Sequence, residues 1–358
     1  MTQVLSIRHR LALEIARKLQ DKVIEEHPLK QLFWECTLRC NLQCRHCGSD
    51  CKKQSLHPDM PKEDFLRVLD SIRKKRDPHS IFVIITGGEP LMRADLEECG
   101  CSIYEKGFPW GIVTNGFAFT EQRFKHLLQA GIHSITVSLD GLEDSHNWMR
   151  NNEYSFKKAS DTIQILASSD DIKFDVVTCV NGKNYSQLQE LKLYLIEKGV
   201  KHWRLFTIFP VGRATNDPQL QLTNEEFRGL LSFIKQTRKE KMIEASYGCE
   251  GFLGNYEGEV RNHFFACQAG VTVGSVLING AISACPSIRS DYHQGNIYQN
   301  DFLDIWEQEY KLYRDRAWMR TGICENCKYF KFCRGNGMHL RDENGNLLFC
   351  HLKRITEI

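Results

Sequence analysis

The stretch CTLRCNLQCRHC, residues 36–47, places four cysteines in twelve positions directly after a short apolar run. Three of them, Cys40, Cys44 and Cys47, have the spacing C-x3-C-x2-C. Three thiolates in one loop can bind three irons of a 4Fe-4S cluster and leave the fourth iron without a protein ligand. The spacing therefore favours an iron-sulfur cluster with one iron open to a small molecule.

The cysteine content of the whole chain agrees with metal binding. The 358 residues include 15 cysteines, crowded toward both ends, and the first thirty residues lack the apolar core of a secretion signal. Because the cytosol keeps thiols reduced, we expect a cytoplasmic protein whose cysteines bind metal. Zinc is the alternative for the first loop, and Cys36 or Cys51 would then complete the usual four ligands.

Composition and charge limit the class of protein. The chain is 42% apolar and 26% charged, which is typical of a globular protein with one large domain and one small one. A net charge of +2 gives no argument for binding nucleic acid or an anionic membrane. No stretch approaches the length of apolar sequence that crosses a bilayer, so we expect no membrane segment.

The pattern after an N-terminal helix predicts the fold. Apolar runs alternate with helical patterns, and the runs are 31–37, 81–87, 110–116, 134–141, 174–181 and 202–210. Apolar strands separated by helices indicate a parallel sheet covered on its outer side. We therefore predict an α/β fold, a partial (β/α)6 parallel barrel. The expected units are an N-terminal helical segment (1–30), the barrel (31–240) and a small C-terminal domain (241–358).

The unusual residues all follow the predicted strands. The cysteine loop follows the first run, and GGEP, TNG, SLDG, TCVN and FPVGRA follow the other five in turn. The carboxyl ends of parallel strands meet at one edge, which is where parallel α/β folds carry their active sites. The sequence thus predicts one site at that edge.

The C-terminal part has a different character. From about residue 241 the chain is rich in glycine and cysteine, with short strands, and the Asn-Gly pair at 279–280 predicts a hairpin. This pattern indicates a small domain organised by metal clusters.

These motifs together resemble the radical S-adenosylmethionine superfamily over nearly the whole chain. The resemblance implies that Cys40, Cys44 and Cys47 bind the 4Fe-4S cluster that reductively cleaves S-adenosyl-L-methionine to a 5'-deoxyadenosyl radical. It also implies a one-electron donor such as flavodoxin or ferredoxin.

The resemblance further implies a binding site for the cofactor. GGEP would hold the methionine amino group, Ser138 the ribose and Arg150 the carboxylate, while His46 would lie near the adenine. The implied cofactor-binding residues are Gly87, Gly88, Glu89, Pro90, Asn115, Ser138, Arg150 and His46. The alternatives are a strand-terminal turn for Ser138 and Asp140, a solvated Arg150 and a surface histidine at 46.

The C-terminal cysteines resemble the auxiliary-cluster extension called the SPASM domain, found in radical enzymes that modify peptides and proteins. The implied ligands of its second auxiliary cluster are Cys324, Cys327, Cys333 and Cys350, and those of its first include Cys267 and Cys285. For the four cysteines of the second auxiliary cluster, a structural zinc site is the alternative.

One position departs from the family pattern. Gly337 stands where a C-x3-C cysteine of the first auxiliary cluster is expected. Cys249 is the candidate replacement, and an ordinary buried thiol there, with a degenerate site, is the alternative. We therefore expect one or two auxiliary clusters.

The remaining cysteines match no motif, and packing is the default explanation for Cys36, Cys51, Cys99 and Cys101. Cys179 differs, because it stands at the active edge of the fifth strand, where a thiol could donate a hydrogen atom to a substrate radical. Core packing is its alternative.

The expected function is maturation of a ribosomally made peptide by a thioether or carbon-carbon cross-link. The alternatives are a formylglycine-forming sulfatase maturase, a peptide epimerase and a non-catalytic relative that only binds a precursor peptide. No separate leader-binding domain is visible, so the N-terminal helix, the C-terminal domain or a separate leader-peptide-binding protein would recognise the substrate.

Overall fold

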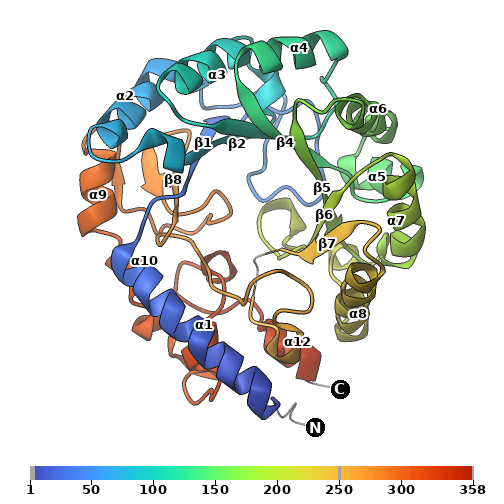
Figure 1. Cartoon of the computed structure of the whole chain (residues 1–358), viewed down its shortest axis with the longest axis vertical. Coiled ribbons are helices and arrows are strands. Elements are labelled where there is room, and N and C mark those ends of the chain that lie inside the picture. Colours follow the sequence, from blue (N-terminus) through green and yellow to red (C-terminus); the bar gives the residue numbers. More distant parts are fainter. Residues whose placement is uncertain (1–4, 249–250, 357–358) are drawn as a thin grey trace.

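One twisted sheet organises the protein (Figure 1). The computed structural model describes residues 5–248 and 251–356. The strands run in the order β10-β9-β8-β1-β2-β3-β4-β5-β6-β7. They are β1 (Gln31–Thr37), β2 (Phe82–Gly87), β3 (Trp110–Thr114), β4 (Ile132–Ser138), β5 (Lys173–Val180), β6 (His202–Thr207), β7 (Glu244–Tyr247), β8 (Val273–Val276), β9 (Ala281–Ser283) and β10 (Gly295–Asn296). The pairs from β1 to β7 are all parallel, which confirms the predicted partial barrel.

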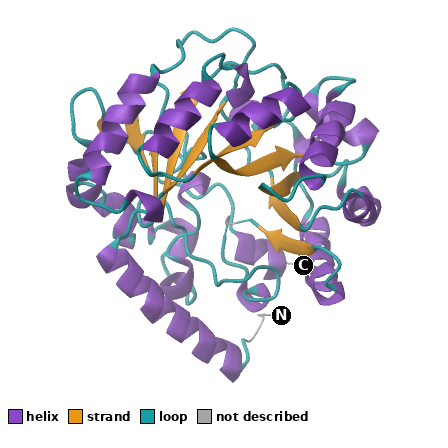
Figure 2. Cartoon of the chain, turned by 45° about the horizontal axis from the view of Figure 1, so that its top comes forward, coloured by secondary structure: helices purple, strands orange, loops and turns teal. Residues whose placement is uncertain are grey.

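Helices cover the outer side of the curved sheet (Figure 2). The helices among the described residues are α1 (Ile7–Glu26), α2 (Lys62–Arg73), α3 (Leu96–Glu105), α4 (Glu121–Gln129), α5 (Glu143–Arg150), α6 (Ser155–Ala167), α7 (Leu188–Glu197), α8 (Asn224–Glu240), α9 (Phe302–Gln308), α10 (Lys311–Arg314), α11 (Phe330–Cys333) and α12 (His351–Thr356). Among the described residues, no helix is both long and apolar enough to cross a membrane.

The helix after the first strand illustrates why these elements pack. Phe65, Val68, Leu69 and Ile72 have the i, i+3, i+4, i+7 spacing of one face of α2, and all four are buried. Phe65 stacks on Trp34 of β1 with ring centroids 4.5 Å apart. The spacing of the apolar residues in the sequence therefore identifies the face of α2 that packs on the sheet.

The C-terminal part continues the same sheet. β8 pairs in parallel with β1, and β9 and β10 follow as antiparallel strands. The predicted hairpin at residues 279–280 is confirmed, with Gly280 in the left-handed region at a φ of 82°. A seventh parallel strand, β7, was not predicted. The domain boundary at residues 240 and 241 stays a prediction, and the sheet runs across it.

The N-terminal helix lies against the C-terminal part of the chain (Figure 1). Leu13 is buried in an apolar cluster with Phe252 and Phe265. Arg334 pairs with Asp21 of α1 and adds an ionic contact. α1 is thereby fixed beside the cysteine-rich region rather than on the barrel.

Candidate functional site

The cysteine loop forms a closed turn at the carboxyl end of β1. The backbone N–H of Cys40 donates to the carbonyl oxygen of Lys52 at 2.8 Å, which ties the start of the loop to its end. Cys40 and Cys44 are each 8% exposed and pack with Cys47, which is half-buried. The thiols of the loop are therefore largely shielded from solvent.

Each of the three sulfurs has a polar donor close to it. Asn115 Nδ2 lies 3.7 Å from Cys40 Sγ, and Arg150 Nη1 lies 3.6 Å from Cys44 Sγ. The third sulfur, that of Cys47, accepts from the backbone N–H of Cys51 at 3.4 Å, and the Arg213 N–H donates to the Cys47 carbonyl oxygen at 3.1 Å.

These donors test the fit of an iron-sulfur cluster. Burial raises the pKa of Cys40 to about 12, so this thiol needs a metal to ionise it. N–H donors aimed at thiolate sulfurs offset the negative charge that such a cluster carries. The residues present therefore fit a 4Fe-4S cluster bound by Cys40, Cys44 and Cys47.

The GGEP segment runs tightly against the cysteine loop. The N–H of Gly88 donates to Thr37 O at 2.7 Å, and that of Glu89 donates to Arg39 O at 2.9 Å. A Cβ at Gly88 would lie 2.1 Å from the Arg39 carbonyl oxygen. Only a residue without a side chain allows this close approach of the two backbones. Pro90 is buried and begins a short 3-10 helix.

Glu89 is a carboxylate 1% exposed at this edge. It accepts hydrogen bonds from Thr114 Oγ1 and the Asn115 N–H, each at 2.7 Å, and from the Leu91 N–H at 3.2 Å. Burial raises its pKa above the ordinary value. An ammonium group in contact with this carboxylate would stabilise its ionised form, as the role inferred for GGEP requires.

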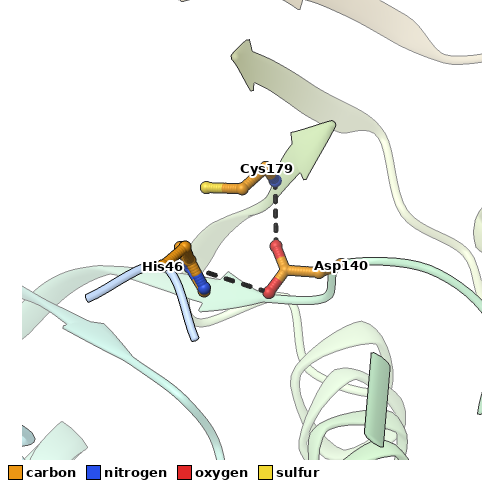
Figure 3. A group of neighbouring side chains, drawn as sticks. All are labelled: His46, Asp140 and Cys179. Carbon is orange, nitrogen blue, oxygen red and sulfur yellow. Dashed lines mark hydrogen bonds and ion pairs between the residues drawn. The ribbon is translucent and has the colours of Figure 1, made fainter. Parts of the chain in front are cut away.

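Asp140 is the centre of a second polar group (Figure 3). Its Oδ2 lies 2.6 Å from Arg150 Nη2 and 4.0 Å from His46 Nε2, and its Oδ1 accepts from the Cys179 N–H at 2.9 Å. Asp140 is 1% and Arg150 7% exposed. The alternative of a solvated Arg150 is therefore wrong, and the arginine links Asp140 to the sulfur of Cys44.

Two histidines lie next to Asp140 and Arg150, and both are uncharged at neutral pH. His146 Nδ1 accepts from the Asp140 N–H at 2.9 Å. Burial lowers the pKa of His146 to about 3 and that of His46 to about 4. His46 Nδ1 and Arg150 Nε are buried without a hydrogen-bond partner. Such unsatisfied polar atoms beside the cysteine loop are suited to contact a bound polar molecule.

The same residues could in principle hold a metal ion, because ligand atoms of His46, Asp140 and Cys179 lie within 4.8 Å of one another. However, Asp140 is already engaged by the Arg150 cation and the Cys179 N–H. A positive guanidinium next to the carboxylate disfavours a second cation. We therefore interpret the group as a polar network beside the cysteine loop.

The structure brings most of the predicted residues together. Asn115, Glu89 and Arg150 each contact the loop or its neighbours, and Cys179 lies beside Asp140 at the end of β5. Ser138 ends β4 and is half-buried.

Sequence reasoning missed the contributions of His146 and Arg213 to this site. For Asp140 it gave a strand-terminal turn as an alternative and assigned no functional role. The segment of Arg213, FPVGRA, was noted only for its place after a strand. The signal for Arg213 was its position at the same strand edge as the cysteines.

The four thiols proposed as ligands of the second auxiliary cluster lie near one another. Burial raises the pKa of Cys333, and the nearby thiols of Cys350, Cys324 and Cys327 raise it further. Arg341 Nη2 lies 3.4 Å from Cys324 Sγ. Four mutually close thiols with a cationic donor fit a cluster whose irons all have protein ligands.

Two further thiols lie together nearby. Burial raises the pKa of Cys285 to about 11, and Cys267 is close enough to add to this effect. Burial opposes ionisation of Cys267, but Arg316 and backbone donors outweigh it and lower the pKa of this thiol. The third candidate ligand, Cys249, lies outside the described residues, and Gly337 begins a short turn.

Comparison with known proteins agrees with this geometry. A model of the radical SAM superfamily matches residues 34–195, and the SPASM model, an iron-sulfur cluster-binding domain, matches residues 267–328. The AdoMet-dependent heme synthase of Oleidesulfovibrio alaskensis is 23% identical, over 94% of this chain and 90% of that protein.

Two further comparisons are with a maturase and with a structure that contains a precursor peptide. Mycofactocin maturase MftC of Mycolicibacterium smegmatis is 27% identical, over 86% of this chain and 77% of that protein. The crystal structure of Streptococcus suis SuiB bound to precursor peptide SuiA is 18% identical, with a TM-score of 0.69 over 90% of this chain and 75% of that chain. The last likeness supports the fold.

Proposed function

Because the chain belongs to the radical S-adenosylmethionine superfamily and carries a SPASM domain, we propose that it modifies a peptide by oxidative cross-linking. The product would contain a thioether or a carbon-carbon bond. The cluster and S-adenosylmethionine, when bound, supply a carbon radical that removes a hydrogen atom from the substrate.

One observation carries the oxidative part of this proposal. Besides the three-thiol loop, the C-terminal part gathers one set of four thiols and a pair formed by Cys267 and Cys285. A cross-link removes two hydrogens from the substrate, so one electron must leave after the first hydrogen is taken. Redox centres bound by these thiols would accept that electron.

The residues of the barrel edge would orient the cofactor. Glu89 would bind its ammonium group, and the unpartnered Arg150 Nε and His46 Nδ1 would contact its other polar groups. Burial of this network excludes water from the bound cofactor and so strengthens these polar contacts.

Two of the compared proteins support a peptide substrate. MftC is named a maturase, and SuiB was crystallised with its precursor peptide.

The outer face of α1 is our candidate for recognising that peptide. Ile7, Leu11, Ile15 and Leu19 form one row at four-residue spacing and are 88%, 63%, 54% and 62% exposed. An exposed apolar row of this kind can pack against a partner helix. Replacing Leu11 and Ile15 with serine should weaken binding of the peptide without changing cleavage of S-adenosylmethionine.

The direct test is anaerobic incubation of the reconstituted enzyme with S-adenosylmethionine, reductant and a library of cysteine-containing peptides. Mass spectrometry should find products lighter by two hydrogen atoms, with 5'-deoxyadenosine formed in parallel. Deoxyadenosine without any changed peptide across the library would count against a peptide substrate.

The same assay separates the alternatives. An epimerase leaves the peptide mass unchanged but incorporates solvent deuterium, and Cys179→Ala would reduce that incorporation. A sulfatase maturase converts a cysteine or serine to an aldehyde. A chain that only binds peptides would not cleave S-adenosylmethionine at all.

A second candidate follows from the heme synthase relatives, which align over most of both chains. A further relative with a porphyrin in its name is the Fe-coproporphyrin III synthase of Methanosarcina barkeri. It is 25% identical over 85% of this chain and 82% of that protein. On this reading the enzyme acts on a porphyrin, and its product is an iron porphyrin. A porphyrin added to the assay should then change mass where the peptides do not.

A further inference from the structure

We propose that Arg341 supplies a buried positive charge that stabilises the reduced form of the auxiliary cluster bound by Cys324, Cys327, Cys333 and Cys350, and so raises its reduction potential. Arg341 belongs to none of the motifs recognised in the sequence. The inference deepens the proposed function, in which this cluster accepts an electron from the substrate radical. It rests on that function only for the purpose of the raised potential.

Arg341 contacts one of the proposed cluster ligands directly. Its Nη2 donates to Cys324 Sγ at 3.4 Å. Arg341 is 2% and Cys324 7% exposed, so water does not screen the guanidinium from the sulfur. A hydrogen bond from a charged donor is stronger in such a buried place than at the surface. Replacing this side chain therefore removes a donor to the sulfur and a charge beside it.

The other hydrogen bonds of Arg341 leave its charge uncompensated. Its Nε and Nη2 donate to the Gly335 carbonyl oxygen at 3.3 and 3.0 Å. Its Nη2 also donates to Met319 O at 3.3 Å, and its Nη1 donates to Gly345 O at 2.8 Å. Within the part of the chain that the structure describes, none of its hydrogen bonds goes to a carboxylate. Because a buried cation without an anion is costly, this site is suited to an anionic cluster.

The backbone fixes Arg341 in this position. Its N–H donates to Met338 O at 3.1 Å, and its carbonyl oxygen accepts from Ser290 Oγ at 3.0 Å. Arg341 also pairs with Leu347 in an antiparallel bridge. The guanidinium is therefore placed by contacts that do not involve the cluster ligands.

A cation beside an iron-sulfur cluster favours its reduced form, because reduction adds a negative charge. Net charge, hydrogen bonds to the sulfurs and solvent exposure set the potential of such clusters. Burial by itself disfavours the added charge, and a buried arginine offsets that cost. A higher potential makes the cluster a better electron acceptor, which is the direction that an oxidative cross-link requires.

The variants separate the charge from the hydrogen bonds. Arg341→Lys keeps the charge with fewer donors, Arg341→Gln keeps donors without the charge, and Arg341→Met keeps neither. The matched control is Arg334→Gln, which removes an equal charge next to Cys333. Arg334 is 27% exposed and pairs with Asp21, so its charge is already balanced and partly screened.

The test measures the midpoint potential of the four-thiol cluster by redox titration with electron paramagnetic resonance, in the full, reconstituted protein without peptide. The signal of this cluster is the one that persists when Cys40, Cys44 and Cys47 are replaced with alanine, and also when Cys267 and Cys285 are. Iron analysis shows whether each variant retains the cluster.

We expect Arg341→Gln and Arg341→Met to shift the potential to more negative values and Arg341→Lys to stay close to the wild type. Arg334→Gln should shift it much less than Arg341→Gln. Equal shifts in the lysine and glutamine variants of Arg341, an equal shift in Arg334→Gln, or no shift would overturn the proposal.

Loss of the cluster is also informative. If the lysine, glutamine and methionine variants of Arg341 all lose it, the proposal is overturned, because Arg341 would then only hold the local fold together. If the two neutral variants lose it and Arg341→Lys retains it, the result supports the proposal, since the positive charge is then what the cluster needs.

The result can be separated from the proposed function. The potential is measured without peptide, so it does not depend on what the enzyme modifies. If the potential falls in Arg341→Gln but the yield of cross-linked peptide per 5'-deoxyadenosine does not, the role of Arg341 stands. The assignment of this cluster as the electron acceptor would then be wrong.

Discussion

At the scale of single residues, Gly88 offers a sharp test of the cofactor site. A Cβ there would meet the Arg39 carbonyl oxygen at 2.1 Å, whereas nothing lies within 4 Å of a Cβ at Gly48 in the cysteine loop. Gly88→Ala must therefore displace GGEP and should weaken binding of S-adenosylmethionine at least tenfold, or about 1.4 kcal/mol. Gly48→Ala is the matched control, and calorimetric titration measures both. Equal affinities would show that the close approach is unimportant for the cofactor.

His146 predicts a pH dependence of stability. Burial lowers its pKa from 6.5 to about 3, so between these values the unfolded chain binds a proton that the folded chain does not. The contribution is complete above pH 6.5 and is lost as pH falls toward the folded pKa.

The variant His146→Asn tests this dependence, because asparagine can keep an acceptor for the Asp140 N–H without titrating. The wild type should lose up to about 1.4 kcal/mol per pH unit more than the variant on acidification. Thermal unfolding at neutral and mildly acidic pH measures the difference. Parallel pH profiles for the two proteins would contradict it.

At the scale of elements, α1 should be held by one buried side chain. Leu13 is 3% exposed and packs with Phe252 and Phe265, whereas Leu11 is 63% exposed. Leu13→Ala should destabilise the attachment of α1 by about 2–5 kcal/mol, and Leu11→Ala by less than about 0.5 kcal/mol. Hydrogen exchange of the α1 amides reports this directly. Unchanged protection in Leu13→Ala would mean that the ionic contacts alone hold the helix.

The strands explain how far the sequence could predict this site. Each strand of β1 to β6 is longer than four residues and was recognisable in the sequence as an apolar run. Because the carboxyl ends of parallel strands meet at one edge, these runs predicted that Cys40, Glu89 and Asn115 lie together. β7 has only four residues and was not recognised. The contact of Arg213 with Cys47 depends on a turn at Gly212, whose φ is 59° and which approaches the Cys47 carbonyl closely. No periodic pattern encodes such a turn.

At the scale of the whole molecule, the number of clusters should be measurable by iron content. Replacing Cys40, Cys44 and Cys47 together with alanine removes one set of ligands and leaves the C-terminal thiols intact. If both auxiliary sites bind 4Fe-4S clusters despite Gly337, the variant should retain about eight irons per chain after anaerobic reconstitution. Iron and sulfide analysis measures this, with the wild type as the reference. A value of about four would leave only the four-thiol site occupied.

The pairing of β1 with β8 also has a consequence for synthesis of the chain. Gln31 pairs with Val273, so β1 emerges from the ribosome long before its neighbour on that side. At about 5–20 residues per second this interval is roughly 10–50 seconds. During that time one edge of an apolar strand has no partner from β8, and open strand edges promote aggregation. Slower synthesis lengthens this exposure, so holding chaperones should improve the yield of folded protein more than a reduced translation rate.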